Sequence, residues 1–506
     1  MLRSRDEGEG SEAASVLGLT RADWLLHDAR IVTFDPRRPV AQAIAVRGGH
    51  VLALGSSAAL RRLAGPGTET VDCRGATVLP GLIDPHLHLF GLAARRLNLD
   101  CAEVASVADL LAAVAARADD LPPGAWLRGE GLDEARLGRL PTAAELEEAA
   151  PARPVRLRHR SRHASVLSTS ALRRLGAGPG VERRDGAATG LISGREEVLG
   201  RLVGRLPPDE MRDALAATAR ELAAVGLTTV ADATPRAARG LAPLREAMAM
   251  GRFPLRVFAM RPPGSRPWRP VGRLFPGAVK VMVEEDPRGL RPRPATLARR
   301  IAIAAAAGAQ VAVHCVGAGT LVAALAAFAA LPRTERAGRR HRLEHVAECP
   351  PPLIRHIAAL GLTVVTNPAF VHWRGDAYVA EAADVPRAWL YRMRSLERAG
   401  IRVAGASDAP VVPASPWVGI AAARSRRTAG GMLLGPAERI GPAAALRLFT
   451  TGAAFALGAD RLGRLVPGGP ADLVVMEPDP LRASPDELAD ARVRLVLAAG
   501  ERAWPA

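Results

Sequence analysis

Lysine is almost absent from this sequence. Lysine and arginine together number 68, and residue 280 is the only lysine. Lys280 lies in the apolar run from Ala278 to Val283, which is typical of a buried strand. A buried lysine can lose its proton, whereas arginine stays charged. The surviving lysine is therefore a candidate for a chemical role, and a chance relic that packs against the core is the alternative.

Cysteine, aromatic residues and long apolar runs are also scarce. The 4 cysteines have no CxxC spacing, which argues against a disulfide framework and favours a reducing compartment. Aromatic residues make up 4% of the chain, so alanine and leucine must fill the core. Residues 1–20 are expected to be a disordered leader. They have no apolar segment, so no signal peptide is expected. No uncharged run is long enough for a membrane span, and we expect a cytoplasmic protein.

Acidic residues are fewer than basic ones, 51 against 68, and the net charge is +17. Such a charge raises the question of nucleic-acid binding. The arginines are scattered, however, and no basic stretch is interleaved with aromatic residues that could stack on bases. An arginine-rich solvated surface is therefore the preferred interpretation, and no nucleic acid or membrane is expected as a partner.

The two ends of the chain share an alternating pattern that predicts β-strands. Near the N-terminus the candidates are 31–34, 43–46 and 51–54, and near the C-terminus they are 472–476 and 493–497. A chain of 506 residues exceeds the size of a single core, so several domains are expected. We expect residues 21–78 and 457–506 to pair into one composite β-sandwich domain.

The middle of the chain repeats a different pattern, in which a helix ends at glycine and an apolar strand follows. Gly226, Gly308, Gly361 and Gly400 each stand at such a junction. Apolar strands that alternate with helices indicate a parallel sheet buried on both faces. The pattern predicts an α/β fold, a (β/α)8 TIM-like barrel over residues 79–456, with an insertion at about 100–200.

Polar residues collect where these strands end, which is where such barrels place their active sites. His86 and His88 are two positions apart and so point to the same side of a strand. Taken alone, the pair fits two core histidines as well as a metal site. Other strands end in similar residues, and imidazole and carboxylate groups suit zinc and related ions. We therefore predict a metal centre from His86, His88, Lys280, His314, His345 and Asp408.

These motifs resemble the amidohydrolase superfamily, and most of all amidohydrolase family 3, which includes N-substituted formamide deformylases. The resemblance runs from about residue 22 to the C-terminus. It rests on the segments Pro80–His88, Val279-Lys280, Val313-His314, Leu343–His345, Ser407–Val411 and Gly463–Val475, and on Pro154–Leu157 followed by His163.

The resemblance implies a role for each matching residue. His86 and His88 would bind the more buried metal, and His314 and His345 the second. Lys280 would be N-carboxylated and bridge two divalent ions, with Zn²⁺ the expected metal. Asp408 would contact the first metal and shuttle the proton, and His163 would reach the substrate carbonyl. The segment after Lys280 departs from the family pattern, because Glu284–Asp286 leads within a few residues to the next helix and shortens a substrate loop.

Other candidate site residues are suggested only by their position in or after a predicted barrel strand. His372 and Trp373 follow a strand and are expected to contact substrate at the barrel mouth, with plain exposure as the alternative. Asp232 ends a strand, and a structural role is favoured for it. Strand alternation predicts that Glu344 points away from the site beside His345.

The sequence therefore predicts a metal-dependent hydrolase that cleaves a C–N bond of a small amide, N-acyl or N-formyl compound with a metal-activated hydroxide. The same centre acting on a lactone, a cyclic amide or an isomerisation substrate is one alternative. A non-catalytic barrel that serves as a binding module is another. A homodimer is one option for the assembly.

Overall fold

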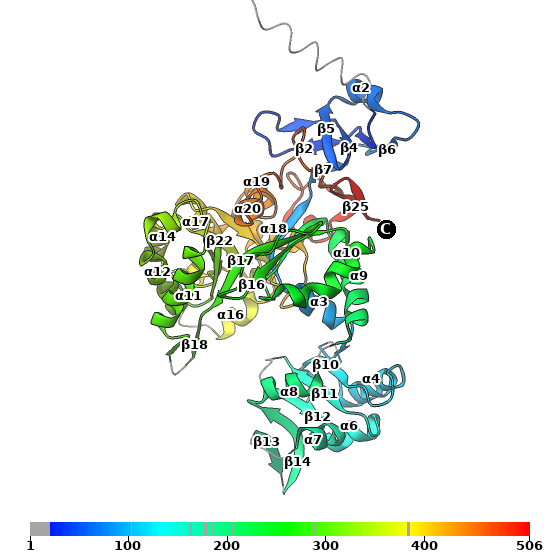
Figure 1. Ribbon diagram of the computed structural model, residues 1–506, viewed down its shortest axis with the longest axis vertical. Helices are drawn as coiled ribbons and strands as arrows, with labels where there is room; N and C mark the ends of the chain where they lie inside the picture. Colours follow the sequence, from blue (N-terminus) through cyan, green and yellow to red (C-terminus); the bar gives the residue numbers. More distant parts are fainter. Residues whose placement is uncertain are drawn as a thin grey trace, which may run out of the picture. The chain divides into compact units, whose positions relative to one another are not determined.

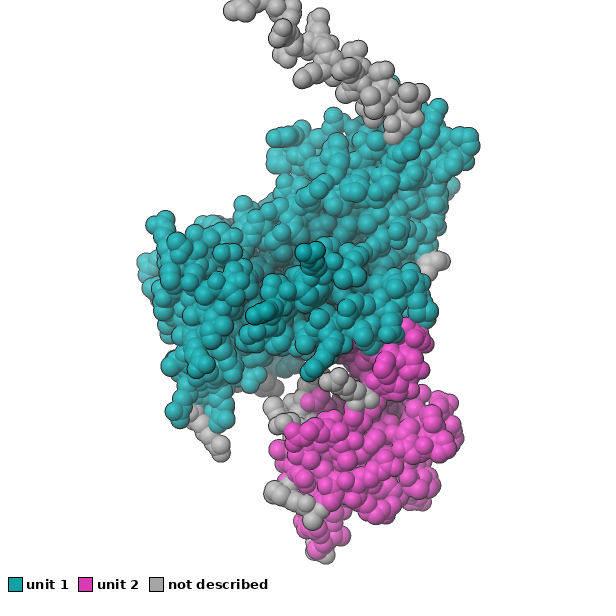
Figure 2. Space-filling view, viewed as in Figure 1, with its two compact units in different colours: residues 1–89, 216–506 teal, residues 90–215 magenta. Residues whose placement is uncertain are grey.

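The computed structural model describes residues 21–102, 104–160, 164–176, 180–184, 186–204, 206–286, 289–381 and 385–505. The chain divides into two compact units, residues 1–89 with 216–506 and residues 90–215 (Figure 2). The predicted leader lies outside the described residues. Among the described helices, none is both long and apolar enough to cross a membrane.

Eight parallel strands form the central sheet of the larger unit, and the sheet curves into a nearly closed TIM-like barrel (Figure 1). Every neighbouring pair in it is parallel, as predicted from the repeated helix–glycine–strand pattern. In sheet order the strands are β8 (Leu82–Leu87), β15 (Leu227–Asp232), β16 (Arg256–Arg261), β17 (Leu274–Met282), β20 (Val311–Cys315), β21 (Arg342–His345), β22 (Thr363–Thr366) and β23 (Val403–Gly405).

Helices of the larger unit connect these strands and cover their outer faces. Gly308 and Gly361 have φ of 75° and 64° and end the helices before β20 and β22, a conformation that glycine adopts without strain. Apolar residues of β17, β20, β21 and β22 pack with those of their flanking helices in one buried core. The helices are α9 (Pro208–Ala224), α10 (Ala242–Ala249), α11 (Pro294–Ala306), α12 (Ala318–Ala329), α14 (Pro351–Ala359), α15 (Pro368–Trp373), α17 (Met393–Arg398), α18 (Pro416–Ser425), α19 (Pro442–Leu448) and α20 (Thr451–Ala456).

The first and last barrel strands meet without a regular ladder, along a seam formed by residues 84–88 and 407–409. The backbone N–H of Asp408 donates to His86 O at 2.9 Å, and that of His88 donates to Ala409 O at 2.7 Å. The Asp84 carboxylate accepts from the backbone N–H of His86 at 3.0 Å and of Ser407 at 3.1 Å. These bonds hold the carboxyl ends of β8 and β23 together.

Strands from both ends of the chain share one six-stranded sheet, in which β24 (Leu473–Glu477) pairs with β7 (Thr77–Pro80). A second sheet of four strands packs on it through a core drawn from both chain ends. That residues 21–78 and 457–506 form one composite β-sandwich domain stays a prediction. The remaining strands are β2 (Arg30–Val32), β3 (Val40–Ala41), β25 (Arg492–Ala498) and β26 (Glu501–Trp504) in the first sheet, and β1 (Trp24–His27), β4 (Ala43–Arg47), β5 (His50–Gly55) and β6 (Glu69–Asp72) in the second.

The smaller unit, residues 90–215, has a six-stranded sheet and its own hydrophobic core. Its strands are β9 (Leu99–Asp100), β10 (Leu127–Leu132), β11 (Val155–His159), β12 (Ala164–Leu167), β13 (Val181–Arg184) and β14 (Ala187–Ser193), and its longer helices include α4 (Val107–Asp119), α6 (Ala143–Ala149), α7 (Thr169–Leu175) and α8 (Glu196–Val203). After β17, the short strands β18 (Glu284–Asp286) and β19 (Gly289–Arg291) pair where the sequence indicates a shortened loop.

Candidate metal centre

The predicted metal ligands converge at the carboxyl ends of the barrel strands. The His86 ring centroid lies 5.8 Å from that of His88 and 4.8 Å from that of His345, and the His314 and His345 centroids are 4.6 Å apart. Lys280 Nζ lies 3.2 Å from His86 Nε2. Asp408 follows β23 and faces the same cluster through its contacts with His86 and His88.

His86, His88 and Asp408 form a donor set that fits a divalent metal ion. Their ligand atoms all lie within 4.8 Å of one another. Asp408 Oδ1 is buried without a hydrogen-bond partner among the described residues, although Nε2 of His86 and of His88 lie 3.5 and 3.2 Å away. A buried carboxylate oxygen without a partner is costly, and a cation bound there would satisfy it. Imidazole nitrogen and carboxylate oxygen are ligands that zinc accepts.

The ionisation of the cluster suits metal binding. Burial, with the nearby Lys280 charge, lowers the pKa of His86 to about 3, and burial beside His345 lowers that of His314 to about 2. Neutral imidazoles of this kind can offer a lone pair to a cation. Burial alone would raise the pKa of Asp408, but the surrounding histidines hold it below its ordinary value, so the carboxylate is charged.

Lys280 is buried, with 2% of its surface exposed. Burial lowers the pKa of its amine to about 8, against the opposing influence of Glu344 and Asp408. A pKa of about 8 leaves roughly a tenth of the amine neutral at pH 7, far more than an unperturbed lysine or an arginine would offer. A neutral amine is the form that can add to CO₂.

Glu344 points into the cluster, so the prediction that it points away is wrong. Its carboxylate accepts a hydrogen bond from His86 Nδ1 and also from Arg342 Nε at 2.5 Å. The cause is the backbone at His345, where φ is 71° and strand alternation ends. Two successive side chains therefore both face the barrel interior.

Glu344 is held as an anion. Burial alone would raise its pKa, but the Arg342 guanidinium and His86 keep it well below its ordinary value. Arg342 also donates to Pro85 O at 2.8 Å, which ties β21 to β8. An anion that accepts from Nδ1 fixes the His86 tautomer with the Nε2 lone pair directed at the cluster.

Two more histidines of the cluster, His345 and His88, are oriented in the same way by polar residues that follow barrel strands. His345 Nδ1 lies 2.8 Å from Asn367 Oδ1, and Asn367 in turn donates to Ala406 O at 3.3 Å. His88 Nδ1 lies 2.7 Å from Thr234 Oγ1. These contacts leave each Nε2 free to face a metal. Neither Asn367 nor Thr234 was singled out as a site residue from sequence, although both follow barrel strands.

Asp232 supports this arrangement from outside the ligand set. Its Oδ1 accepts from the backbone N–H of Thr234 at 3.2 Å, and its Oδ2 lies 3.5 Å from Arg236 Nε. Burial raises its pKa. Its contacts thus position the residue that orients His88.

The predicted substrate contacts are less well placed by the structure. His163 lies outside the described residues. His372 and Trp373 end helix α15, which begins directly after Asn367, and their rings are 4.8 Å apart. Trp373 is 45% exposed. Among the described residues, no hydrogen bond or ring contact joins either of them to the metal ligands, and their substrate role stays a prediction.

Comparison with known proteins adds independent findings. The model of the amidohydrolase family matches residues 69–503. The N-substituted formamide deformylase of Arthrobacter pascens is 29% identical over 526 aligned positions, which cover 93% of this chain and 96% of that enzyme.

Two solved structures share the fold. An uncharacterized metal-dependent hydrolase from Pyrococcus horikoshii OT3 superposes with a TM-score of 0.77 at 22% identity, over 92% of this chain and 99% of the other. A second one, from Pyrococcus furiosus, superposes with a TM-score of 0.75 at 25% identity, over 91% of this chain and 100% of the other.

Proposed function

This chain belongs to the amidohydrolase family, and on that premise we propose that it hydrolyses the C–N bond of a small N-formyl or N-acyl amide. The observation that carries the proposal is the buried cluster itself, in which His86, His88 and Asp408 offer donor atoms within 4.8 Å of one another. The similarity to a formamide deformylase along nearly the whole chain supports the choice of substrate class.

We propose that His86, His88 and Asp408 hold one divalent ion and that His314 and His345 hold a second. Lys280 would bridge the two as its N-carboxylated form, and its buried Nζ already lies 3.2 Å from Nε2 of His86, one of the proposed ligands. The nitrogen and oxygen donors favour Zn²⁺. When bound, such ions supply an acidified water and polarise the substrate carbonyl.

Asp408 would then transfer the proton during hydrolysis. Asp408 is ionised, so the carboxylate oxygen that does not hold the ion can accept a proton from the attacking water. The same carboxyl group can return that proton to the departing nitrogen, since an amine leaves more readily when protonated. Glu344 and Arg342 would keep His86 in place during this cycle through the contacts that they make in the cluster.

Substrate recognition is proposed for His163, His372 and Trp373. The exposed Trp373 ring, at the end of the helix that follows β22, suits an apolar group on the amide nitrogen or acyl carbon. His163 would donate a hydrogen bond to the carbonyl oxygen, where negative charge develops.

Amine release from a panel of substrates tests this proposal. N-alkyl formamides, N-acetyl amines and cyclic amides are compared with matched esters and lactones, using the metal-loaded protein. We expect hydrolysis of the formamides or acyl amines, and a loss of roughly 10²–10⁴-fold in kcat for Asp408→Asn.

Turnover of only the esters or lactones would overturn the C–N assignment. Absence of turnover on every compound, with metal bound, would favour the non-catalytic binding module. Arg447→Gln is a matched control, because this residue pairs with Glu397 on the surface, and it should leave turnover unchanged.

A further inference from the structure

A cavity of about 450 Å³ lies beside the amino-terminal ends of β20 and β21. Its wall includes Gln310, which directly precedes β20, and the loop 338–340, which precedes β21. The metal ligands His314 and His345 stand at the other ends of these same strands. None of the predicted metal ligands is among the described residues that line the cavity.

Arginine is the only charged residue type in the described lining of this cavity. Four of its lining residues are arginine (Arg261, Arg339, Arg340 and Arg342), and none of the described ones is Asp or Glu. Two of the four already have a counter-ion: Arg340 binds the Asp460 carboxylate at 2.6 Å, and Arg342 binds that of Glu344. The uncompensated positive charge in the cavity comes from the other two.

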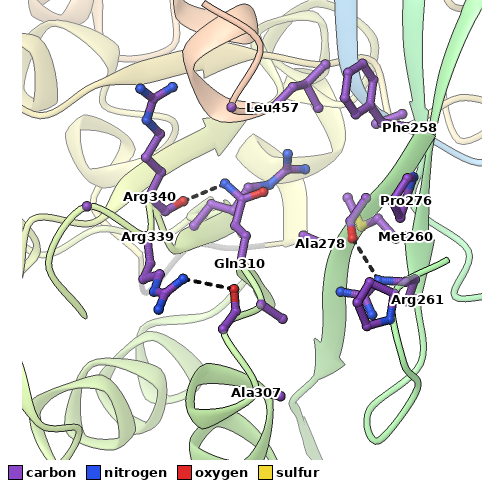
Figure 3. A pocket seen from close by; sticks show the side chains of 18 residues that line it. Phe258, Met260, Arg261, Pro276, Ala278, Ala307, Gln310, Arg339, Arg340 and Leu457 are labelled. Carbon is purple, nitrogen blue, oxygen red and sulfur yellow. Dashed lines mark hydrogen bonds between the residues drawn. The ribbon is translucent and has the colours of Figure 1, made fainter. Parts of the chain in front are cut away.

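Of these two, Arg261 is the stronger candidate for binding an anion, because its side chain is buried and only 5% exposed. Its Nε donates to Gly277 O at 3.1 Å and its Nη1 to Ser265 O at 3.1 Å, but no carboxylate pairs with it among the described residues. A buried guanidinium without a counter-ion is costly, and one that keeps an unused donor group can bind an anion. Figure 3 shows Arg261 on one side of the cavity and Arg339 on the opposite side.

Apolar side chains elsewhere in the lining suit a carbon skeleton. Phe258, Met260, Pro276 and Leu457 contribute side chains to the wall (Figure 3). Gln310 is engaged by its donations to Arg340 O at 2.7 Å and Ala456 O at 2.9 Å, so its amide N–H groups are not available to a ligand. The volume falls within the roughly 300–1,000 Å³ of small-molecule pockets and is much larger than an inorganic ion requires.

We propose that this cavity is a second ligand site, which binds a small organic carboxylate with its anionic group at Arg261 and its apolar body against Phe258, Met260 and Leu457. Arg339, at the exposed rim, would add longer-range attraction for the anion. Arg342 lines the same cavity and donates a hydrogen bond to Glu344. A ligand in the cavity would therefore lie next to a residue that helps to orient His86.

Benzoate is the probe that tests this site, with benzyl alcohol as its uncharged counterpart. Binding to the metal-loaded protein is measured by calorimetry. We expect saturable benzoate binding, much weaker binding of benzyl alcohol, and a weakening of roughly 10-fold or more for benzoate in Arg261→Gln. Asp408→Asn separates this site from the metal centre, and it should retain the benzoate affinity that Arg261→Gln removes.

Several results would overturn the proposal. These are the absence of saturable benzoate binding, equal affinity for benzoate and benzyl alcohol, and benzoate binding that Asp408→Asn abolishes while Arg261→Gln leaves it intact. If Arg261→Gln does not fold, Arg339→Gln decides the question, because this exposed side chain can change without loss of the core. It should weaken benzoate binding by about 3-fold, and unchanged affinity would contradict the site.

Discussion

At the scale of single residues, the centre depends on a chain of contacts behind the metal ligands. Arg342 neutralises Glu344, Glu344 accepts from His86 Nδ1, and His86 Nε2 faces the cluster. Each member is buried, so none can replace its partner with water. A buried charge that loses its partner is strongly destabilising, and its neighbours must then move.

Glu344→Gln should therefore weaken metal binding although Glu344 is outside the predicted ligand set. The neutral amide cannot balance Arg342 and is a poorer acceptor for His86 Nδ1. We expect a loss of roughly 10–100-fold in metal affinity, measured by competition with a chromogenic chelator. Glu397→Gln is the matched surface control. Unchanged affinity in Glu344→Gln would show that His86 is oriented by other contacts.

The sequence could predict which side chains gather in the cluster, but not the residues that support them. His314 and His345 could be predicted as site residues because a polar residue near the end of an apolar strand is a local signal, and Lys280 because it is the only lysine and lies in an apolar run. Glu344 was not, since the positive φ of His345 that turns both side chains inward leaves no trace in the residue pattern. Asn367 also ends a strand, but only the fold shows that it accepts from His345.

At the scale of elements, the seam between β8 and β23 joins the two ends of the barrel sheet and carries three of the predicted ligands, His86, His88 and Asp408. His86 and Asp408 are joined there by their backbones, and Asp84 accepts from the backbone N–H groups of His86 and Ser407. The repeated pattern predicted the strands, whereas the seam depends on a pairing between residues far apart in the chain. The relative positions of His86 and Asp408 therefore depend on the hydrogen bonds of the seam.

Asp84→Ala should lower the melting temperature of the metal-free protein. It leaves two buried N–H groups without an acceptor, at a cost of roughly 1–3 kcal/mol for each. Thermal unfolding followed by circular dichroism measures the change, with Asp490→Ala on the surface as control. A melting temperature equal to that of the wild type would show that the seam does not depend on Asp84.

At the scale of the whole molecule, the end sheets and the barrel are parts of one compact unit. Strand β7 ends at Pro80 and β8 begins at Leu82, so the six-stranded sheet leads directly into the strand that carries His86. Leu497 lies on β25, is completely buried and belongs to the core shared by both chain ends. The alternating patterns at the two ends predicted these strands, but not which of them would pair.

Leu497→Asp should therefore reduce metal content from a distance. A carboxylate buried in that core would disrupt the packing of both sheets and loosen the start of β8. We expect a lower soluble yield and less metal per chain, measured by size-exclusion chromatography and elemental analysis. Arg492→Asp, on the exposed part of the same strand, should retain both. Full metal occupancy in Leu497→Asp would mean that the barrel assembles independently of the end sheets.

The central claim is that Lys280 bridges two metal ions in a hydrolytic centre. The most direct measurement is elemental analysis of purified wild-type protein and of Lys280→Arg, alongside turnover of the best amide substrate. We predict about two divalent ions per chain in the wild type, and loss of most of the metal and activity in the variant, because arginine cannot take up CO₂ as a bridging ligand. Full metal content and full turnover in Lys280→Arg would contradict the account.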